Sequence, residues 1–102
     1  NTHDSMTCTE VPLEIMATSV QVIESCVFMA RHGSVLALSD AGAAAVLAKA
    51  ALQAASLNVV INIGSMDDAE RAEGYRNQME DLLAAGCAMA DEVYADVVKR
   101  LS

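Results

Sequence analysis

The sequence predicts an all-α protein: a long-helix bundle with three main helices per chain, completed by oligomerisation. Three observations lead to this fold class. Apolar residues recur at alternating steps of three and four through three long segments, which is the spacing of a helix face and not of a strand. Hydrophobic residues make up 54% of the 102 residues and aromatic ones only 3%, so the apolar mass is mostly Ala, Val, Leu and Met. Pro12 is the single proline, so little interrupts the helices that follow it.

The first helix is expected near residues 10–31. Thr9 is a candidate N-cap, and Pro12 falls in the first turn, where its missing N–H removes no helical hydrogen bond. One apolar face follows at helical spacing: Leu13, Met16, Val20, Ile23, Val27 and Ala30. A second stripe predicts burial on two sides: Ile15, Val22, Cys26 and Met29. The helix is expected to end at Arg31-His32-Gly33, with cations near its negative end and glycine as the terminator.

The second helix is expected near residues 39–63, after a short linker over 34–38. Ser39 and Asp40 are its capping candidates. The segment carries one charge after Asp40, that of Lys49, and nine alanines: Ala41, Ala43, Ala44, Ala45, Ala48, Ala50, Ala51, Ala54 and Ala55. A helix that is apolar all round lies inside a larger assembly, and its small side chains let neighbouring helices approach closely.

This apolar segment allows two other interpretations. The run 58–63 is β-branched and would suit a strand, but no partner strand occurs elsewhere, so we interpret it as the helix end, terminated by Gly64. The stretch 41–63 is apolar enough for a membrane span, but Lys49 near its middle would cost roughly 2.5–3.5 kcal/mol there. A buried helix of a soluble protein is therefore the stronger interpretation, and no membrane partner is expected.

The third helix is expected near residues 66–101, with Ser65 and Asp68 as a weak capping box. Its apolar face is Tyr75, Met79, Leu82, Gly86, Met89, Val93 and Val97. A helix of about 30 residues is roughly 45 Å long, which exceeds a compact domain of 100 residues. We therefore expect an obligate homo-oligomer, at least a dimer. The domain organisation expected is a polar N-terminal segment over 1–9 and a single helical domain over 10–102.

Charge and cysteine content restrict the partners and the compartment. The net charge is −8, with 6 basic and 14 acidic residues, which argues against nucleic acid or an anionic membrane as the main partner. The three cysteines, Cys8, Cys26 and Cys87, are odd in number and match no metal motif. A signal peptide is not expected, because the sequence shows no basic stretch followed by an apolar run. We expect reduced thiols, no metal and a cytoplasmic protein.

Three features carry potential chemistry, and each has a structural interpretation beside it. Ser39-Asp40-Ala41-Gly42 reads first as an ordinary helix cap. Asn58 and Asn62 lie four residues apart in an apolar helix, where amides either satisfy the structure or face a ligand with polar edges. The opening Glu10-Val-Pro-Leu-Glu14 reads as a helix start and nothing more. His32 at a helix end is more often a structural cap than a catalyst.

Taken in order, these features resemble the formiminotetrahydrofolate cyclodeaminase / methenyltetrahydrofolate cyclohydrolase family. The similar strings are Glu10-Val-Pro-Leu-Glu-Ile-Met16, Ser39-Asp-Ala-Gly-Ala-Ala-Ala-Val-Leu47 and Ala54-Ala-Ser-Leu-Asn-Val-Val-Ile-Asn-Ile63. The resemblance covers about residues 10–101 and matches the C-terminal half of a unit about twice this length. One departure is the stretch 34–38, which lacks the Asn residues that the family usually carries there.

The resemblance implies one-carbon folate chemistry with a tetrahydrofolate derivative as substrate and no covalently bound cofactor. The family's reactions close 5-formiminotetrahydrofolate with loss of ammonia, or open the methenyl bridge with water. Asp40 is the candidate catalytic residue, because a carboxylate at a helix N-terminus is favoured in its charged form. Ser39 would orient Asp40, and Asn58 and Asn62 would bind the substrate. Two alternatives remain: a catalytically inactive helical oligomerisation module and a generic helical scaffold.

Overall fold

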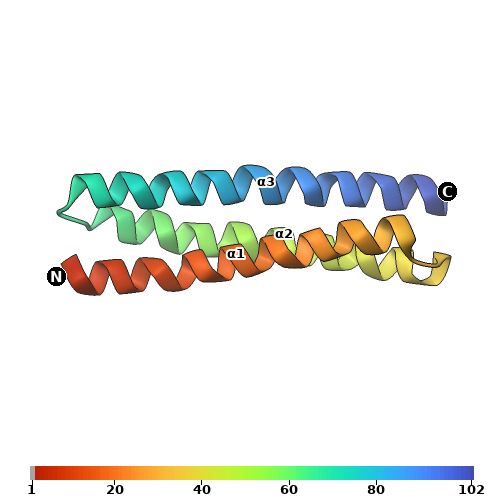
Figure 1. Cartoon of the computed structure of the whole chain (residues 1–102), viewed down its shortest axis with the longest axis horizontal. Helices are drawn as coiled ribbons and strands as arrows, with labels where there is room; N and C mark the ends of the chain where they lie inside the picture. The colour runs from red at the N-terminus through yellow and green to blue at the C-terminus, as the bar shows by residue number, and fades with distance from the viewer. Residues whose placement is uncertain (1) are drawn as a thin grey trace.

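The computed structural model describes the backbone of residues 2–102 and the side chains from residue 8 onward. Three helices run up, down and up again: α1 (Thr2–His32), α2 (Val35–Gly64) and α3 (Ala69–Leu101). They lie side by side along their whole length, with the two termini at opposite ends (Figure 1). No strand occurs in the described part of the chain. The prediction of an all-α fold with three long helices is therefore confirmed, and the run 58–63 is helical.

The bundle is a rod with one shared core along its axis. The rod measures 52 × 16 × 16 Å, and its radius of gyration of 15.9 Å exceeds the value of about 13 Å for a compact chain of this length. The most buried large side chains are Met16, Ile23, Leu38, Leu52 and Val59. The expected faces of α1 and α3 supply much of the core, with Val27, Leu82 and Met89 partly buried at its margin.

The predicted start of the first helix was wrong, because α1 begins at Thr2 and not near residue 10. Thr9 is therefore not a cap: it lies within the helix and is fully buried. Pro12 lies inside the helix as well and not in its first turn. The predicted end was correct, since α1 stops at His32. A Cβ on Gly33 would collide with the Met29 carbonyl oxygen, so the tight turn requires a glycine.

The predicted linker over 34–38 was also wrong. Ser34 is the N-cap of α2, with an extended backbone and no capping bond from its side chain, and the helix starts at Val35. Leu38 explains the early start, because it is 1% exposed and anchors the first turn of α2 in the core. Ser39 and Asp40 consequently lie in the second turn, beyond the first turn where the helix dipole acts on charges.

The third helix begins three residues later than predicted. Asp68 is the N-cap of α3, and its carboxylate accepts the backbone N–H of Arg71 at 3.1 Å. Ser65 belongs to the end of α2 and not to α3, since its hydroxyl donates to the Asn62 carbonyl oxygen at 3.0 Å. The capping box expected at Ser65 is therefore replaced by a cap at Asp68 itself.

Within one chain, the second apolar stripe of α1 is not buried as predicted. Ile15, Val22 and Met29 are 49%, 42% and 43% exposed, and only Cys26 of that stripe lies in the core. Three helices surround one central axis, so each helix keeps an outward face that no other helix covers. The helices Cys8–His32 and Val35–Gly64 are long and apolar enough to cross a membrane by length and composition, a test that core helices of soluble proteins also pass.

Two glycines of α3 test how tightly the rod is packed. A Cβ on Gly86 would meet Leu52 Cδ2 and lie 3.1 Å from Val20 Cγ2, both in the core, whereas a Cβ on Gly74 would meet nothing within 4 Å. We expect Gly86→Ala to lower the free energy of unfolding by about 1–2 kcal/mol, because overpacking outweighs the gain in helix propensity. Gly74→Ala should raise it by roughly 0.5–1 kcal/mol. Urea unfolding followed by circular dichroism measures both free energies. If the two substitutions changed the free energy of unfolding equally, the close packing around Gly86 would be contradicted.

Candidate functional site

The four predicted site residues do not form one site within a single chain. Ser39 and Asp40 lie in the second turn of α2, and Asn58 and Asn62 lie near its other end. Asp40 and Asn58 are eighteen residues apart, which is five helical turns and about 27 Å. Five whole turns also place the two side chains on the same side of α2. One chain therefore aligns these two polar groups along a single line without bringing them into contact.

Asp40 is exposed and makes no hydrogen bond or ion pair with another described residue. Its neighbour Ser39 is exposed too, and the Ser39 hydroxyl donates no hydrogen bond to Asp40 within the described chain. The carboxylate is thus available to a ligand or to another polypeptide. The predicted orienting contact from Ser39 is not formed in this chain.

Asn62 has a structural role that involves the single proline. Pro12 has no N–H, so the carbonyl oxygen four residues earlier, that of Cys8, loses its usual partner in the helix. The side-chain amide Nδ2 of Asn62 donates to this Cys8 oxygen at 2.9 Å. The amide therefore ties the end of α2 to the break in the hydrogen bonding of α1. Asn58, one turn earlier, is exposed and has no such partner in the described chain.

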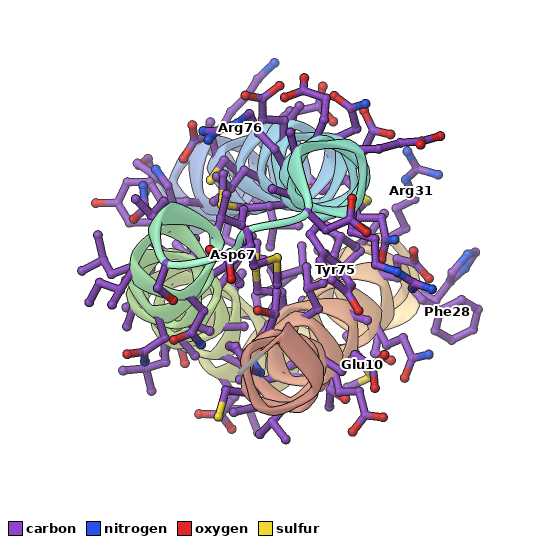
Figure 2. The ribbon with its side chains drawn as sticks, turned by 90° about the vertical axis from the view of Figure 1, so that its left-hand side faces the viewer. Glu10, Phe28, Arg31, Asp67, Tyr75 and Arg76 are labelled. Atoms are coloured by element: carbon purple, nitrogen blue, oxygen red, sulfur yellow. The ribbon has the colours of Figure 1, made fainter. Side chains whose placement is uncertain are left out.

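A groove between α1 and α3 contains polar groups that the sequence analysis did not assign to a site. It has a volume of about 810 Å³ and is lined in part by Glu10, Glu14, Arg71, Tyr75 and Asp81. The Tyr75 hydroxyl donates to Glu10 Oε1 at 3.1 Å, and Figure 2 shows Tyr75 reaching from α3 toward α1, where Glu10 lies. The two glutamates of the Glu10–Glu14 string were the available signal, since residues four apart share one helix face.

This groove presents three carboxylates and one guanidinium beside a buried phenol. Burial raises the pKa of Tyr75, and the hydrogen bond to Glu10 raises it further. The phenol therefore stays protonated and acts as a donor, while the carboxylates can accept hydrogen bonds from N–H groups. The groove is open to solvent and shows no nucleophile beside a base.

Metal and thiol chemistry find little support among the described side chains. No three His, Cys, Asp or Glu residues converge there in a way that could hold a metal ion. Cys8, Cys26 and Cys87 are free thiols. Burial raises the pKa of the Cys26 thiol, which keeps it protonated and makes it a poor nucleophile.

Comparison with known proteins assigns the chain to a family. The sequence model of the formiminotransferase-cyclodeaminase family matches residues 3–81. Methenyltetrahydrofolate cyclohydrolase from Methylorubrum extorquens strain AM1 is 34% identical over 96 residues, which cover 94% of this chain and 46% of that protein. The chain therefore belongs to the formiminotransferase-cyclodeaminase family. It spans about half the length of the curated relative that it matches.

The two asparagines provide a matched test of the structural bond. Asn→Ala in a helix gains propensity, so at a concentration where the chain is monomeric Asn58→Ala should leave the free energy of unfolding unchanged or slightly higher. Asn62→Ala removes the donor to the Cys8 carbonyl and should leave the protein about 1 kcal/mol less stable than Asn58→Ala. Chemical unfolding of both variants measures the difference. Equal stabilities would show that the bond contributes nothing.

The phenol of Tyr75 predicts a pH dependence at the alkaline end. Its pKa is raised in the folded chain, so the stability it contributes is fully present below the unfolded value of about 10. That contribution is lost as the pH rises through the folded pKa. Tyr75→Phe should therefore show a smaller loss of stability than the wild type between about pH 9 and pH 11. Urea unfolding of both proteins at the two pH values measures the loss. If the wild type and Tyr75→Phe lost the same free energy of unfolding, the raised pKa of Tyr75 would be contradicted.

Proposed function

We propose that this chain is a functional part of a one-carbon folate enzyme that acts on formimino- or methenyl-tetrahydrofolate. The observation that carries the proposal is the match of nearly the whole chain to a protein named methenyltetrahydrofolate cyclohydrolase. Cyclohydrolase chemistry is the first choice for this reason, and cyclodeaminase chemistry is the second through the family description. The free thiols fit a reducing compartment such as the cytoplasm.

The proposed reaction is proton-transfer chemistry at a carbon that lies between two nitrogens. Water adds to the cationic methenyl carbon and loses a proton, which gives a hydroxyl group on the carbon between the two nitrogens. One carbon–nitrogen bond then breaks as the released nitrogen takes up a proton and the hydroxyl loses its proton to form the formyl C=O, so that one proton is released overall. A carboxylate near this carbon can accept the proton from water and return it to the nitrogen, and it also stabilises the cationic methenyl group. We assign this role to Asp40, whose carboxylate is exposed and not engaged by another described residue.

The polar residues on the same helix are assigned to substrate binding. Asn58 offers both an amide donor and a carbonyl acceptor, since neither is used in the described chain. Asn62 donates one amide hydrogen to the Cys8 carbonyl oxygen, so its Oδ1 acceptor remains available to a ligand. Ser39 lies next to Asp40 and is assigned to orient it once substrate is bound.

The assignment of Asp40 is tested by pairing binding with turnover. Asp40→Asn keeps the size of the side chain and removes the charge, so turnover of 5,10-methenyltetrahydrofolate should fall by about 10²–10⁴-fold while binding changes little. Glu80→Gln is the matched control, because Glu80 is exposed on α3 and forms no hydrogen bond or ion pair with another described residue. Loss of the substrate's absorbance reports turnover, and a fluorescence or calorimetric titration reports binding. A wild-type chain that neither binds nor converts the folate would favour the inactive oligomerisation module.

A further inference from the structure

The outward side of α2 carries a continuous seam with the spacing of a coiled coil. Steps of four and three residues select eight positions, all of them exposed: Leu36, Asp40, Ala43, Leu47, Ala50, Ala54, Leu57 and Ile61. The four large apolar members are 86%, 70%, 65% and 68% exposed in chain order. Alternating steps of three and four with small and aliphatic residues are the pattern by which one helix packs against another. Among the side chains that the structure describes, none covers the seam.

The area of this surface is large enough for a stable interface. The large side chains exposed on α2 and on the adjoining stripe of α1 leave on the order of 1,000 Å² accessible, against about 800 Å² per partner in a standard interface. The charges lie elsewhere: α3 carries eleven charged residues, whereas α2 carries only Asp40 and Lys49. Lys49 is turned toward α3, where its Nζ lies 2.7 Å from Asp91 Oδ1. Two copies of this acidic chain joined through α2 therefore keep most of their charges apart.

The seam is self-complementary only when the two helices run antiparallel. A two-fold axis between residues 48 and 49 places Leu36 opposite Ile61, Ala43 opposite Ala54, and Leu47 opposite Ala50. Large residues then meet at the ends, and near the centre each large Leu47 meets the small Ala50 of the partner helix, so that the two helices can approach closely. A parallel pair would instead put Asp40 opposite Asp40 in an apolar seam, which like charges disfavour.

We propose that a second copy of this chain docks antiparallel on α2, and that the partner's Asn58 completes the site around Asp40. The same two-fold axis sets Asp40 beside Leu57 and Asn58 of the partner subunit. A carboxylate covered by an apolar interface requires a hydrogen-bond donor, and the Asn58 amide supplies one. Two groups that one chain holds about 27 Å apart thus meet twice in a symmetric dimer. The proposal of a dimer does not depend on the proposed function, whereas the role of Asp40 and the partner's Asn58 in catalysis rests on it.

Cross-linking tests the geometry without any need for activity. In a background with Cys8, Cys26 and Cys87 replaced by Ser or Ala, Asp40→Cys and Asn58→Cys are made in separate copies and mixed. A short bismaleimide should join the mixture into dimers and leave each variant alone uncross-linked, because identical positions lie more than 20 Å apart by helical rise. Ala43→Cys with Ala54→Cys should behave in the same way, because identical positions of that pair lie about 16 Å apart along the helix, which a short bismaleimide does not span. Ala85→Cys on exposed α3, mixed with either, should give no dimer.

Sedimentation of the chain with its native cysteines supplies the second measurement. We expect a dimer at micromolar concentration that Ala50→Glu shifts to monomer by at least tenfold in the dissociation constant, while Ala85→Glu leaves it unchanged. A folded wild-type monomer would overturn the proposal. So would cross-linking of Asp40→Cys with itself, or flotation of the wild type with neutral phosphatidylcholine vesicles in place of dimerisation.

Mixing two inactive variants separates the shared site from the proposed function. In a mixed dimer of Asp40→Asn and Asn58→Ala, one site carries both changes and the other carries neither. Random exchange should therefore restore about a quarter of wild-type turnover. No recovery in a cross-linkable mixture would overturn the shared site. If the wild type itself has no turnover, the proposed function fails, and the cross-linking alone decides whether Asp40 meets the partner's Asn58.

Discussion

The thickness of the bundle is the constraint on which the rest of this structure depends. Three helices around one axis give a rod only 16 Å across, so no helix is enclosed on all sides. α3 meets this condition with a charged outward face, but α2 has only two charged residues and places mostly apolar side chains outside. The bundle can bury Leu38, Leu52 and Val59 in its core, and it must then leave Leu36, Leu47 and Leu57 exposed. The apolar outer face of α2 follows from the helix count and needs no special local structure.

The same constraint explains why the candidate site is spread along the rod. A single long helix places residues of one face at fixed distances, and nothing in a three-helix rod folds that helix back on itself. Asp40 and Asn58 therefore share a line on α2 and cannot share a pocket. Any chemistry that needs both must draw on a second polypeptide. The groove between α1 and α3, with its Tyr75–Glu10 hydrogen bond, is by contrast complete within one chain.

Pro12 and Asn62 show how one residue can acquire its role from another far away in the sequence. Each was interpreted by itself, the proline as a first-turn residue and the asparagine as a polar group in an apolar helix. The fold joins them, because the proline leaves a carbonyl without its helical donor and the asparagine supplies one. The structural interpretation of an amide in an apolar helix therefore applies to Asn62, whereas Asn58 keeps both its donor and its acceptor for a partner or ligand.

The sequence by itself determined the helical class, the number of helices and the family, because periodicity and motif order are properties of the chain alone. It also predicted the end of α1 and the core faces of α1 and α3. The starts of all three helices were wrong, since Thr9, Ser39 and Ser65 are plausible caps, and only the contact of residues such as Leu38 with the core decides where a helix begins. Only the tertiary structure decided which apolar stripe is covered and how far Asp40 lies from Asn58. Periodicity shows which residues share a face, but burial depends on what packs against that face.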